Sequence, residues 1–266
     1  MKKQITLSFL LLTIVAQAQV IPVGFIKSSR PSTLVNQPTG TNPVTDNLLL
    51  YLDATRTASY GGSGTTWTDI SGSNNSATFN NSPTYGSGSI SNGSGSFTFA
   101  SNKYALTSNL ITSTLSSATF IAWVNPSQTQ NTYAGIIFSR AGNPATGLNF
   151  YNNNSIGYHW NNSGSTWGWD SGLRVPNDEW SMVAVTINST TATVYLCRYT
   201  GITTARNSTT HTATNGSLRF YIGTEPYDIL GRATIGKIAT AMVYSSTLTL
   251  DNITAIFNAQ KAAFGL

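Results

Sequence analysis

A chain of 266 residues has room for one large β sandwich and does not require a second full domain. Only 9% of the residues are charged, against a usual share of roughly 25%, while 40% are hydrophobic, which excludes an intrinsically disordered chain. The formal net charge is +5, but beyond the pair Lys2 and Lys3 the Lys and Arg residues are scattered singly without a basic run. Nucleic-acid binding is therefore not expected.

The first 18 residues have the features of a bacterial export signal. Lys2 and Lys3 precede an apolar stretch over residues 5–15, and Ala16-Gln17-Ala18 has the small-x-small form of a cleavage site. The stretch is too short to span a bilayer, and no later stretch is long and apolar enough, so no transmembrane segment is expected. We expect residues 1–18 to be removed, residues 19–45 to form a Pro-containing extended leader, and the protein to be secreted or held at the cell surface.

Residues 46–266 read as one β domain. A strand is expected over residues 47–53, followed by a long looped excursion over residues 55–96 that is rich in Gly, Ser, Thr and Asn. Short apolar runs then recur about every ten residues, which predicts an all-β, two-sheet antiparallel jelly-roll sandwich. The expected strands cover residues 119–124, 135–139, 148–151, 156–160, a hairpin of 180–187 with 191–197, and a closing strand within 231–244.

One helix is expected, at the carboxyl end. It begins near Leu250, with Thr249 as its N-cap and Ile253, Ile256 and Phe257 on one face. Core positions are expected for the single cysteine, which excludes an intrachain disulfide, and for three tryptophans. These are Cys197, Trp67, Trp123 and Trp180.

Several blocks resemble one family. LYLDA at residues 50–54, SGTTWTDISG at 63–72, ATFIAWV at 118–124, and WDSGL at 169–173 are similar to blocks of the laminin-G-like, concanavalin A-like jelly rolls of secreted bacterial proteins. The resemblance covers residues 46–266 and implies a concanavalin A-like sandwich with a short C-terminal helix. These blocks are specific for the fold but do not specify the ligand. The resemblance also implies a calcium site, which is a usual accessory of the family. One departure is the closing strand, where residues 237–243 lack the acidic residue that the family usually has.

The same fold hosts glycoside hydrolases, which need two carboxyl groups flanking the scissile bond. Glu179 and Glu225 are the only glutamates, both beside turn signals, and the neighbours Asp178 and Glu179 would point to opposite faces of a strand. With His159 and His211 as the only histidines and no Gly-x-Ser-x-Gly elbow, a nucleophilic hydrolase is disfavoured too. We expect no enzyme activity.

A carbohydrate site needs an exposed aromatic platform beside polar partners. Two segments, YHWN at 158–161 and WGWD at 167–170, supply both, joined by a predicted hairpin loop. Trp160 and Trp169 also fit core packing, so Trp167 is the preferred platform. The candidate ligand-binding residues are Tyr158, His159, Asn161, Trp167, Trp169 and Asp170, with Arg140 and Asn143 on the same rim.

Calcium is the cofactor that the resemblance implies, with Asp53 and Asp69 as candidate ligands beside Asn74 and Asn75. Alternatively, Asp69 caps a turn by accepting backbone N–H bonds. The sequence thus favours a secreted, non-enzymatic module that binds a glycan or another surface ligand through loops at the sandwich edge. A structural or adhesive protein is the alternative, favoured if every Trp is buried, and a glycoside hydrolase is third.

Overall fold

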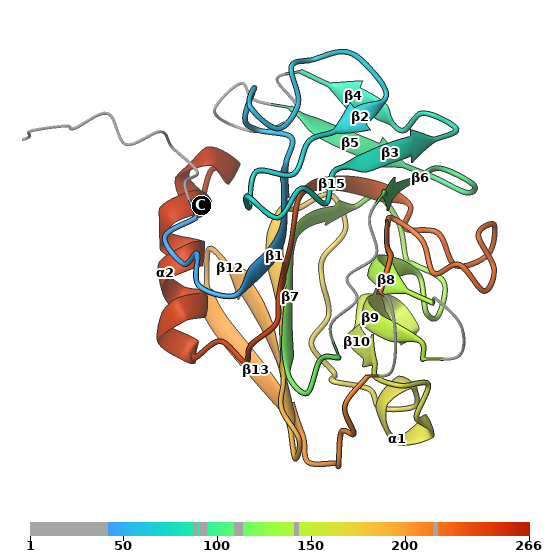
Figure 1. The fold of residues 1–266 in the computed structure, drawn as a ribbon, viewed down its shortest axis with the longest axis vertical. Coiled ribbons are helices and arrows are strands. Elements are labelled where there is room, and N and C mark those ends of the chain that lie inside the picture. The colour runs from blue at the N-terminus through green and yellow to red at the C-terminus, as the bar shows by residue number, and fades with distance from the viewer. Residues whose placement is uncertain (1–41, 88–89, 91–94, 109–113, 141–143, 215–217) are drawn as a thin grey trace, which may run out of the picture. The chain divides into compact units, whose positions relative to one another are not determined.

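The computed structural model describes residues 42–87, 90, 95–108, 114–140, 144–214 and 218–266 (Figure 1). The predicted signal at 1–18 and the leader up to residue 41 lie outside the described residues. Within the unit Gln37–Leu266, two antiparallel sheets pack face to face, and a helix lies along the outer side of the larger sheet (Figure 1). The predicted two-sheet antiparallel sandwich with a short C-terminal helix is confirmed.

The larger sheet of the described residues has the strand order β13-β12-β11-β7-β15-β5-β4. One edge of β15 pairs with β7 along its length, while the other edge pairs with β5 over residues 236–238 and with β1 over residues 240–244. The strands are β1 (Leu48–Asp53), β4 (Thr84–Gly86), β5 (Ser96–Phe99), β7 (Ala118–Pro126), β11 (Ser181–Ile187), β12 (Ala192–Arg198), β13 (Gly201–Asn207) and β15 (Gly236–Tyr244).

The smaller sheet has the order β10-β9-β8-β14-β6-β3-β2 within the same described part of the chain. Its strands are β2 (Thr66–Trp67), β3 (Ala77–Asn80), β6 (Tyr104–Thr107), β8 (Gly135–Ser139), β9 (Thr146–Phe150), β10 (Ile156–His159) and β14 (Phe220–Ile222). The predicted loop over residues 55–96 contains β2, β3 and β4, which the prediction missed. Strands of two to four residues between Gly, Ser and Asn are too short to show a period of two.

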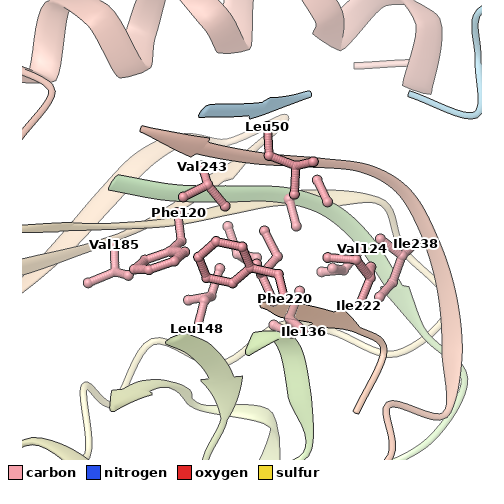
Figure 2. Packing of buried hydrophobic residues seen from close by; sticks show 14 of the residues in the cluster. Leu50, Phe120, Val124, Ile136, Leu148, Val185, Phe220, Ile222, Ile238 and Val243 are labelled. Carbon is pink, nitrogen blue, oxygen red and sulfur yellow. The ribbon is translucent and has the colours of Figure 1, made fainter. Parts of the chain in front are cut away.

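The main core fills the space between the sheets. Alternate residues of β7, among them Phe120 and Val124, point inward and meet Phe220 and Ile222 of β14 on the other sheet (Figure 2). Trp67 is fully buried in this core, as predicted. The packed side chains join two sheets that share few backbone contacts, so burial of apolar surface is the main interaction between them.

A second core lies on the outer face of the larger sheet. Helix α2 (Leu250–Gln260) and the 3₁₀ turn η2 (Lys261–Phe264) cover it, and Cys197 is buried there. Burial raises the pKa of the Cys197 thiol to about 12, so the thiol remains protonated at neutral pH. The predicted N-cap is confirmed, because the Thr249 side chain accepts a hydrogen bond from the backbone N–H of Asn252, which bonds back to Thr249 as a capping box.

Trp123 connects the helix to the sheet. Its ring stacks on Phe264 with the centroids 3.9 Å apart and the planes at 8°, and on Phe257 at 5.8 Å. Its Nε1 donates a hydrogen bond of 2.7 Å to Oε1 of Gln260. Phe264 also contacts Trp180, with ring centroids 5.0 Å apart. No helix in the described part of the chain is both long enough and apolar enough to cross a membrane.

We expect Phe264→Ala to lower the free energy of unfolding by about 3 kcal/mol, because it removes a buried ring that stacks on Trp123. Urea denaturation followed by tryptophan fluorescence measures the change. Leu250→Ala, on an exposed side chain at the start of the same helix, is the control and should cost less than about 0.5 kcal/mol. Equal effects of the two substitutions would show that the helix is not anchored through Phe264.

Candidate functional site

A pocket of about 230 Å³ lies at the outer face of the smaller sheet, beside the ends of β8 and β10. Side chains alternate along β10, so Tyr158 enters the core while its neighbour His159 faces outward into the pocket. The lining combines the aromatic rings of two tyrosines and one tryptophan with one imidazole, two guanidinium groups and one amide. The lining residues are Tyr133, Arg140, His159, Asn162, Trp167, Tyr227 and Arg232.

A glycine shapes the floor of the pocket. Gly147 of β9 lies between His159 of β10 and Phe138 of β8 in the cross-strand register. Because Gly147 has no side chain, the rings of Phe138 and His159 approach to 4.9 Å between centroids. A Cβ at Gly147 would come within 2.3 Å of the carbonyl oxygen of Ile137, and the residue has a φ of +156°. Any other residue would therefore disturb both the sheet and the pocket floor.

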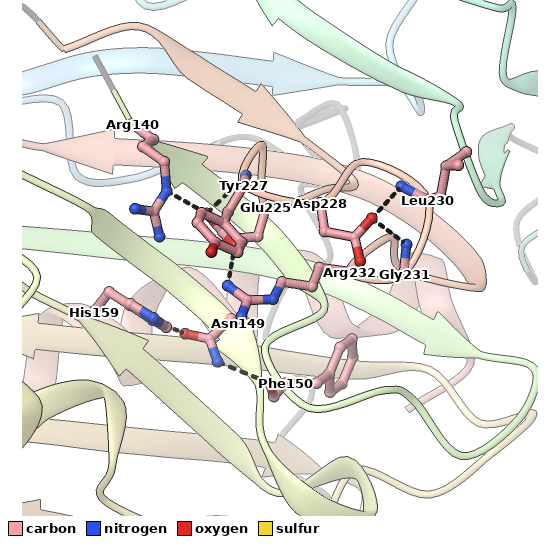
Figure 3. A network of polar contacts seen from close by, with 10 residues as sticks. All are labelled: Arg140, Asn149, Phe150, His159, Glu225, Tyr227, Asp228, Leu230, Gly231 and Arg232. Atoms are coloured by element: carbon pink, nitrogen blue, oxygen red, sulfur yellow. Dashed lines mark hydrogen bonds and ion pairs between the residues drawn. The ribbon is translucent and has the colours of Figure 1, made fainter. Parts of the chain in front are cut away.

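His159 is held in one orientation and one protonation state. Its Nδ1 lies 3.0 Å from Oδ1 of Asn149, whose Nδ2 donates to the carbonyl of Phe150 at 2.8 Å (Figure 3). That second bond directs Oδ1 at the ring, so Nδ1 carries the proton and Nε2 is a hydrogen-bond acceptor. Burial, with a further effect of the charges on Arg140 and Arg232, lowers the pKa of His159 to about 3. The imidazole is neutral at physiological pH.

Two arginines share one buried carboxylate behind the pocket. Arg140 follows β8, and its Nε lies 2.6 Å from Oε1 of Glu225, while Nη1 of Arg232 bonds to Oε2 (Figure 3). The Glu225 side chain is fully buried. Its Oε1 also accepts a bond of 3.1 Å from the backbone N–H of Tyr227. These bonds connect the loop over residues 225–232 to the end of β8.

Aromatic rings form the walls around the two guanidinium groups. Arg140 and Arg232 both lie against the ring of Tyr227, at 5.1 and 4.7 Å from its centroid, and Arg232 also lies 4.8 Å from that of Tyr133. The rings of Tyr133 and Trp167 meet edge to face at 6.2 Å. Such cation–π and edge-to-face contacts limit the movement of the arginines and of the wall.

Trp167 reaches the rim from a single helical turn, α1 (Gly164–Trp167), at a place where the sequence predicted only a loop. The turn forms because Oγ1 of the buried Thr166 accepts from the N–H of Trp160 and donates to the carbonyl of Ser163. The Nε1 of Trp167 donates a hydrogen bond of 3.2 Å to the carbonyl of Asn162. Trp167 is 38% exposed, whereas Trp160 is buried in the core between the sheets.

The structure brings together three of the predicted binding residues, namely Arg140, His159 and Trp167. Asn143 lies outside the described residues. Tyr158, although predicted beside them, has its hydroxyl within the core, 2.9 Å from both Nε2 of His211 and Nδ2 of Asn207.

The other predicted residues have structural contacts outside the pocket lining. Trp169 packs on the inter-sheet core, as the alternative for it proposed. Asp170 accepts hydrogen bonds from Ser155 Oγ and from the N–H of Gly172, at the base of the same loop. Asn161 donates to the carbonyl of Thr212 at 2.8 Å. Asp170 and Asn161 thus use their polar groups to hold loops.

Four lining residues were not predicted: Tyr133, Asn162, Tyr227 and Arg232. Asn162 adjoins a predicted segment. Tyr227 and Arg232 lie more than fifty residues along the chain from the predicted segments 158–161 and 167–170, and they reach the pocket because β14 pairs with β8 in the sheet. A pairing between distant strands leaves no local pattern that would have revealed them.

The predicted calcium ligands have a different environment from a calcium site. Asp53 accepts from the Tyr51 hydroxyl and from N–H and Oγ1 of Thr55, and burial raises its pKa. Asp69 accepts from the backbone N–H groups of Tyr51, Ser71 and Asn75. N–H and O–H donors occupy the oxygens that a cation would need, so these residues do not fit calcium. Within the described ranges, no three His, Cys, Asp or Glu residues form a metal-holding group.

Comparison with solved structures found similar folds. Domain 4 of AbnA, a GH43 extracellular arabinanase from Geobacillus stearothermophilus solved with arabinotriose, has a TM-score of 0.58 and 16% identity, and the match covers 79% of this chain and 98% of that one. Trypanosoma rangeli sialidase with a covalent intermediate has a TM-score of 0.54 and 14% identity, over 82% of this chain and 33% of that one. A GH54 α-L-arabinofuranosidase has a TM-score of 0.54 and 12% identity, over 75% and 51%.

The chain thus spans about a third of the sialidase and half of the arabinofuranosidase. At these identities the likeness concerns the fold. A comparison with curated protein sequences found no match. A family model described as the concanavalin A-like lectin/glucanases superfamily, Laminin_G_3, matches residues 99–254. Because that match covers more than half of the chain and the two-sheet sandwich agrees with it, the protein belongs to the Laminin_G_3 family of the concanavalin A-like superfamily.

Proposed function

We propose that this protein is an exported, non-enzymatic module that binds a carbohydrate in the pocket between Trp167 and the arginine pair. The observation that carries the proposal is the pocket itself, in which the partly exposed Trp167 lies beside guanidinium donors and the acceptor nitrogen of His159. A sugar ring has apolar C–H faces and a rim of hydroxyls, so it needs an aromatic surface and polar groups that converge on it.

The size of the pocket suits a short ligand. Its volume of about 230 Å³ is below the range of roughly 300–1,000 Å³ typical of sites for drug-sized molecules. One sugar unit could lie in it, with neighbouring units outside along the exposed edge formed by Tyr227. This arrangement favours recognition of a single residue of a glycan, such as a chain end or a branch.

The carboxylate geometry supports binding over hydrolysis. Glycoside hydrolysis commonly needs two carboxyl groups about 5 Å or roughly 6.5–9.5 Å apart with access to the scissile bond. Glu225 is the carboxylate that both lining arginines contact, and its two oxygens are engaged by Arg140 and Arg232 behind the wall. A carboxylate that is buried and shared by two guanidinium groups is poorly placed to donate a proton or attack a sugar.

The similar structures are compatible with this proposal. The arabinanase domain, matched over almost its full length, was solved with arabinotriose, and the sialidase and arabinofuranosidase also act on sugars by name. The structural or adhesive alternative is favoured when every Trp is buried, but Trp167 is 38% exposed. Export through residues 1–18 completes the proposal, since glycans are met mainly outside the cell.

We expect Trp167→Ala to weaken glycan binding by at least about tenfold, because the platform for the sugar face is lost. A glycan array followed by isothermal titration calorimetry with the best ligand measures this. Tyr199→Ala is the matched control, since Tyr199 is 69% exposed but lies between β12 and β13 of the larger sheet. Unchanged binding by Trp167→Ala, or equal loss in both variants, would contradict the proposed site.

The affinity should vary by less than about twofold between pH 5 and pH 8, because His159, whose ordinary pKa lies in this interval, does not change charge there. His159 has a pKa lowered to about 3 and stays neutral. Burial raises the pKa of Tyr133, so its hydroxyl stays protonated. Calorimetry across this interval tests the expectation. An affinity that falls as the pH drops through 6.5 would mean that His159 takes up a proton in the folded protein.

A further inference from the structure

The two arginines of the pocket have more hydrogen-bond donors than partners. A guanidinium group has five N–H donors. Among the described residues, Arg140 uses Nε and Arg232 uses Nη1, both on Glu225. The side chains are only 19% and 24% exposed, and the pocket is where their unused N–H groups can find an acceptor. The lining is therefore rich in donors that a ligand can satisfy.

The pocket also has an excess of positive charge. Glu225 supplies one negative charge for two guanidinium groups, and His159 is neutral. Asp228 lies on the same loop, but its Oδ1 accepts from the N–H groups of Leu230 and Gly231 and it does not line the pocket (Figure 3). A net positive charge in a partly buried site favours an anion, because screening by water is reduced there.

We propose that the pocket binds an acidic sugar, a uronic acid whose ring carboxylate bonds to the unused N–H groups of Arg140 and Arg232. This inference rests on the proposed carbohydrate-binding function and names its ligand class. Planar guanidinium groups match a carboxylate through two parallel hydrogen bonds. Nε2 of His159 accepts a bond from a sugar hydroxyl, and Trp167 contacts the ring.

A carboxylate attached directly to the ring fits the pocket better than a sulfate ester does. A uronic acid has nearly the size of the neutral sugar, whereas a sulfate ester projects a tetrahedral group well beyond the ring. The limited volume of about 230 Å³ leaves little room for that extension. Glu225 is then a positioning residue, because it orients both guanidinium groups without facing the ligand itself.

The test compares matched ligands on the unmodified full chain by isothermal titration calorimetry. Oligosaccharides containing galacturonate, glucuronate or mannuronate are each paired with the carboxyl-reduced neutral form, and a sulfated oligosaccharide is included. We expect at least one acidic form to bind tenfold or more tightly than its neutral counterpart, with an affinity that falls as salt is added.

Three results would overturn the inference, and they separate it from the proposed function. Equal binding of acidic and neutral forms keeps the carbohydrate module and removes the acidic preference. Preference for the sulfated ligand keeps an anion site and removes the carboxylate. Absence of binding to these ligands and to a broad glycan array removes both proposals.

Variants locate the selectivity. Arg140→Gln and Arg232→Gln should each reduce the ratio of acidic to neutral affinity by about tenfold, whereas Arg206→Gln, on exposed β13, should leave the ratio unchanged. Because each pocket substitution removes a partner of buried Glu225, Arg140→Lys is added: it keeps the charge beside Glu225 but loses the planar fork. A folded Arg140→Lys protein that retains the full ratio would contradict the assignment.

Discussion

Burial of both faces of the larger sheet is the constraint on which the other features depend. Strands β7, β11 and β15 are apolar on both sides, so one face packs on the smaller sheet and the other needs a separate cover. Helix α2 and η2 provide it, through Trp123 and the rings of Phe257 and Phe264. The outer face of the smaller sheet has no such helix over it in the described structure. Its outward positions are therefore available for polar and aromatic residues that contact a ligand.

Glu225 determines how rigid that outer face is at the pocket. Moving a carboxylate from water into the protein interior costs roughly several kcal/mol, and only close, well-directed hydrogen-bond and ion-pair partners offset this cost. Arg140, just after the end of β8, and Arg232, at the far end of the 225–232 loop, supply them, while Tyr227 lies against both guanidinium groups. The loop, the strand end and the ring are thus held together before a ligand arrives. Less conformational entropy is then lost on binding.

Features set by residues close together in the sequence could be predicted, whereas features set by contacts between distant segments could not. Helix α2 has a local cap at Thr249 and a period of its own, and β7 is a continuous apolar run, so both could be read from the sequence. The alternation of side chains along a strand also places His159 and Tyr158 on opposite faces, but it does not tell which of the two faces packs on the core. The loop that brings Arg232 to Arg140 depends on the pairing of β14 with β8, which has no signal in either segment.

The chemistry of the site comes from loops and strand ends, not from the fold. The same sandwich is found in an arabinanase domain and a sialidase at 16% and 14% identity, so the sheets alone do not select a ligand. In this chain, donors from two guanidinium groups lie on one side of the pocket and a neutral acceptor on His159 lies at its floor. A ligand that satisfies both must present an acceptor group and a hydroxyl donor in a fixed relation. That requirement imposes one orientation on the ligand, which is how a small pocket can be selective without a large contact area.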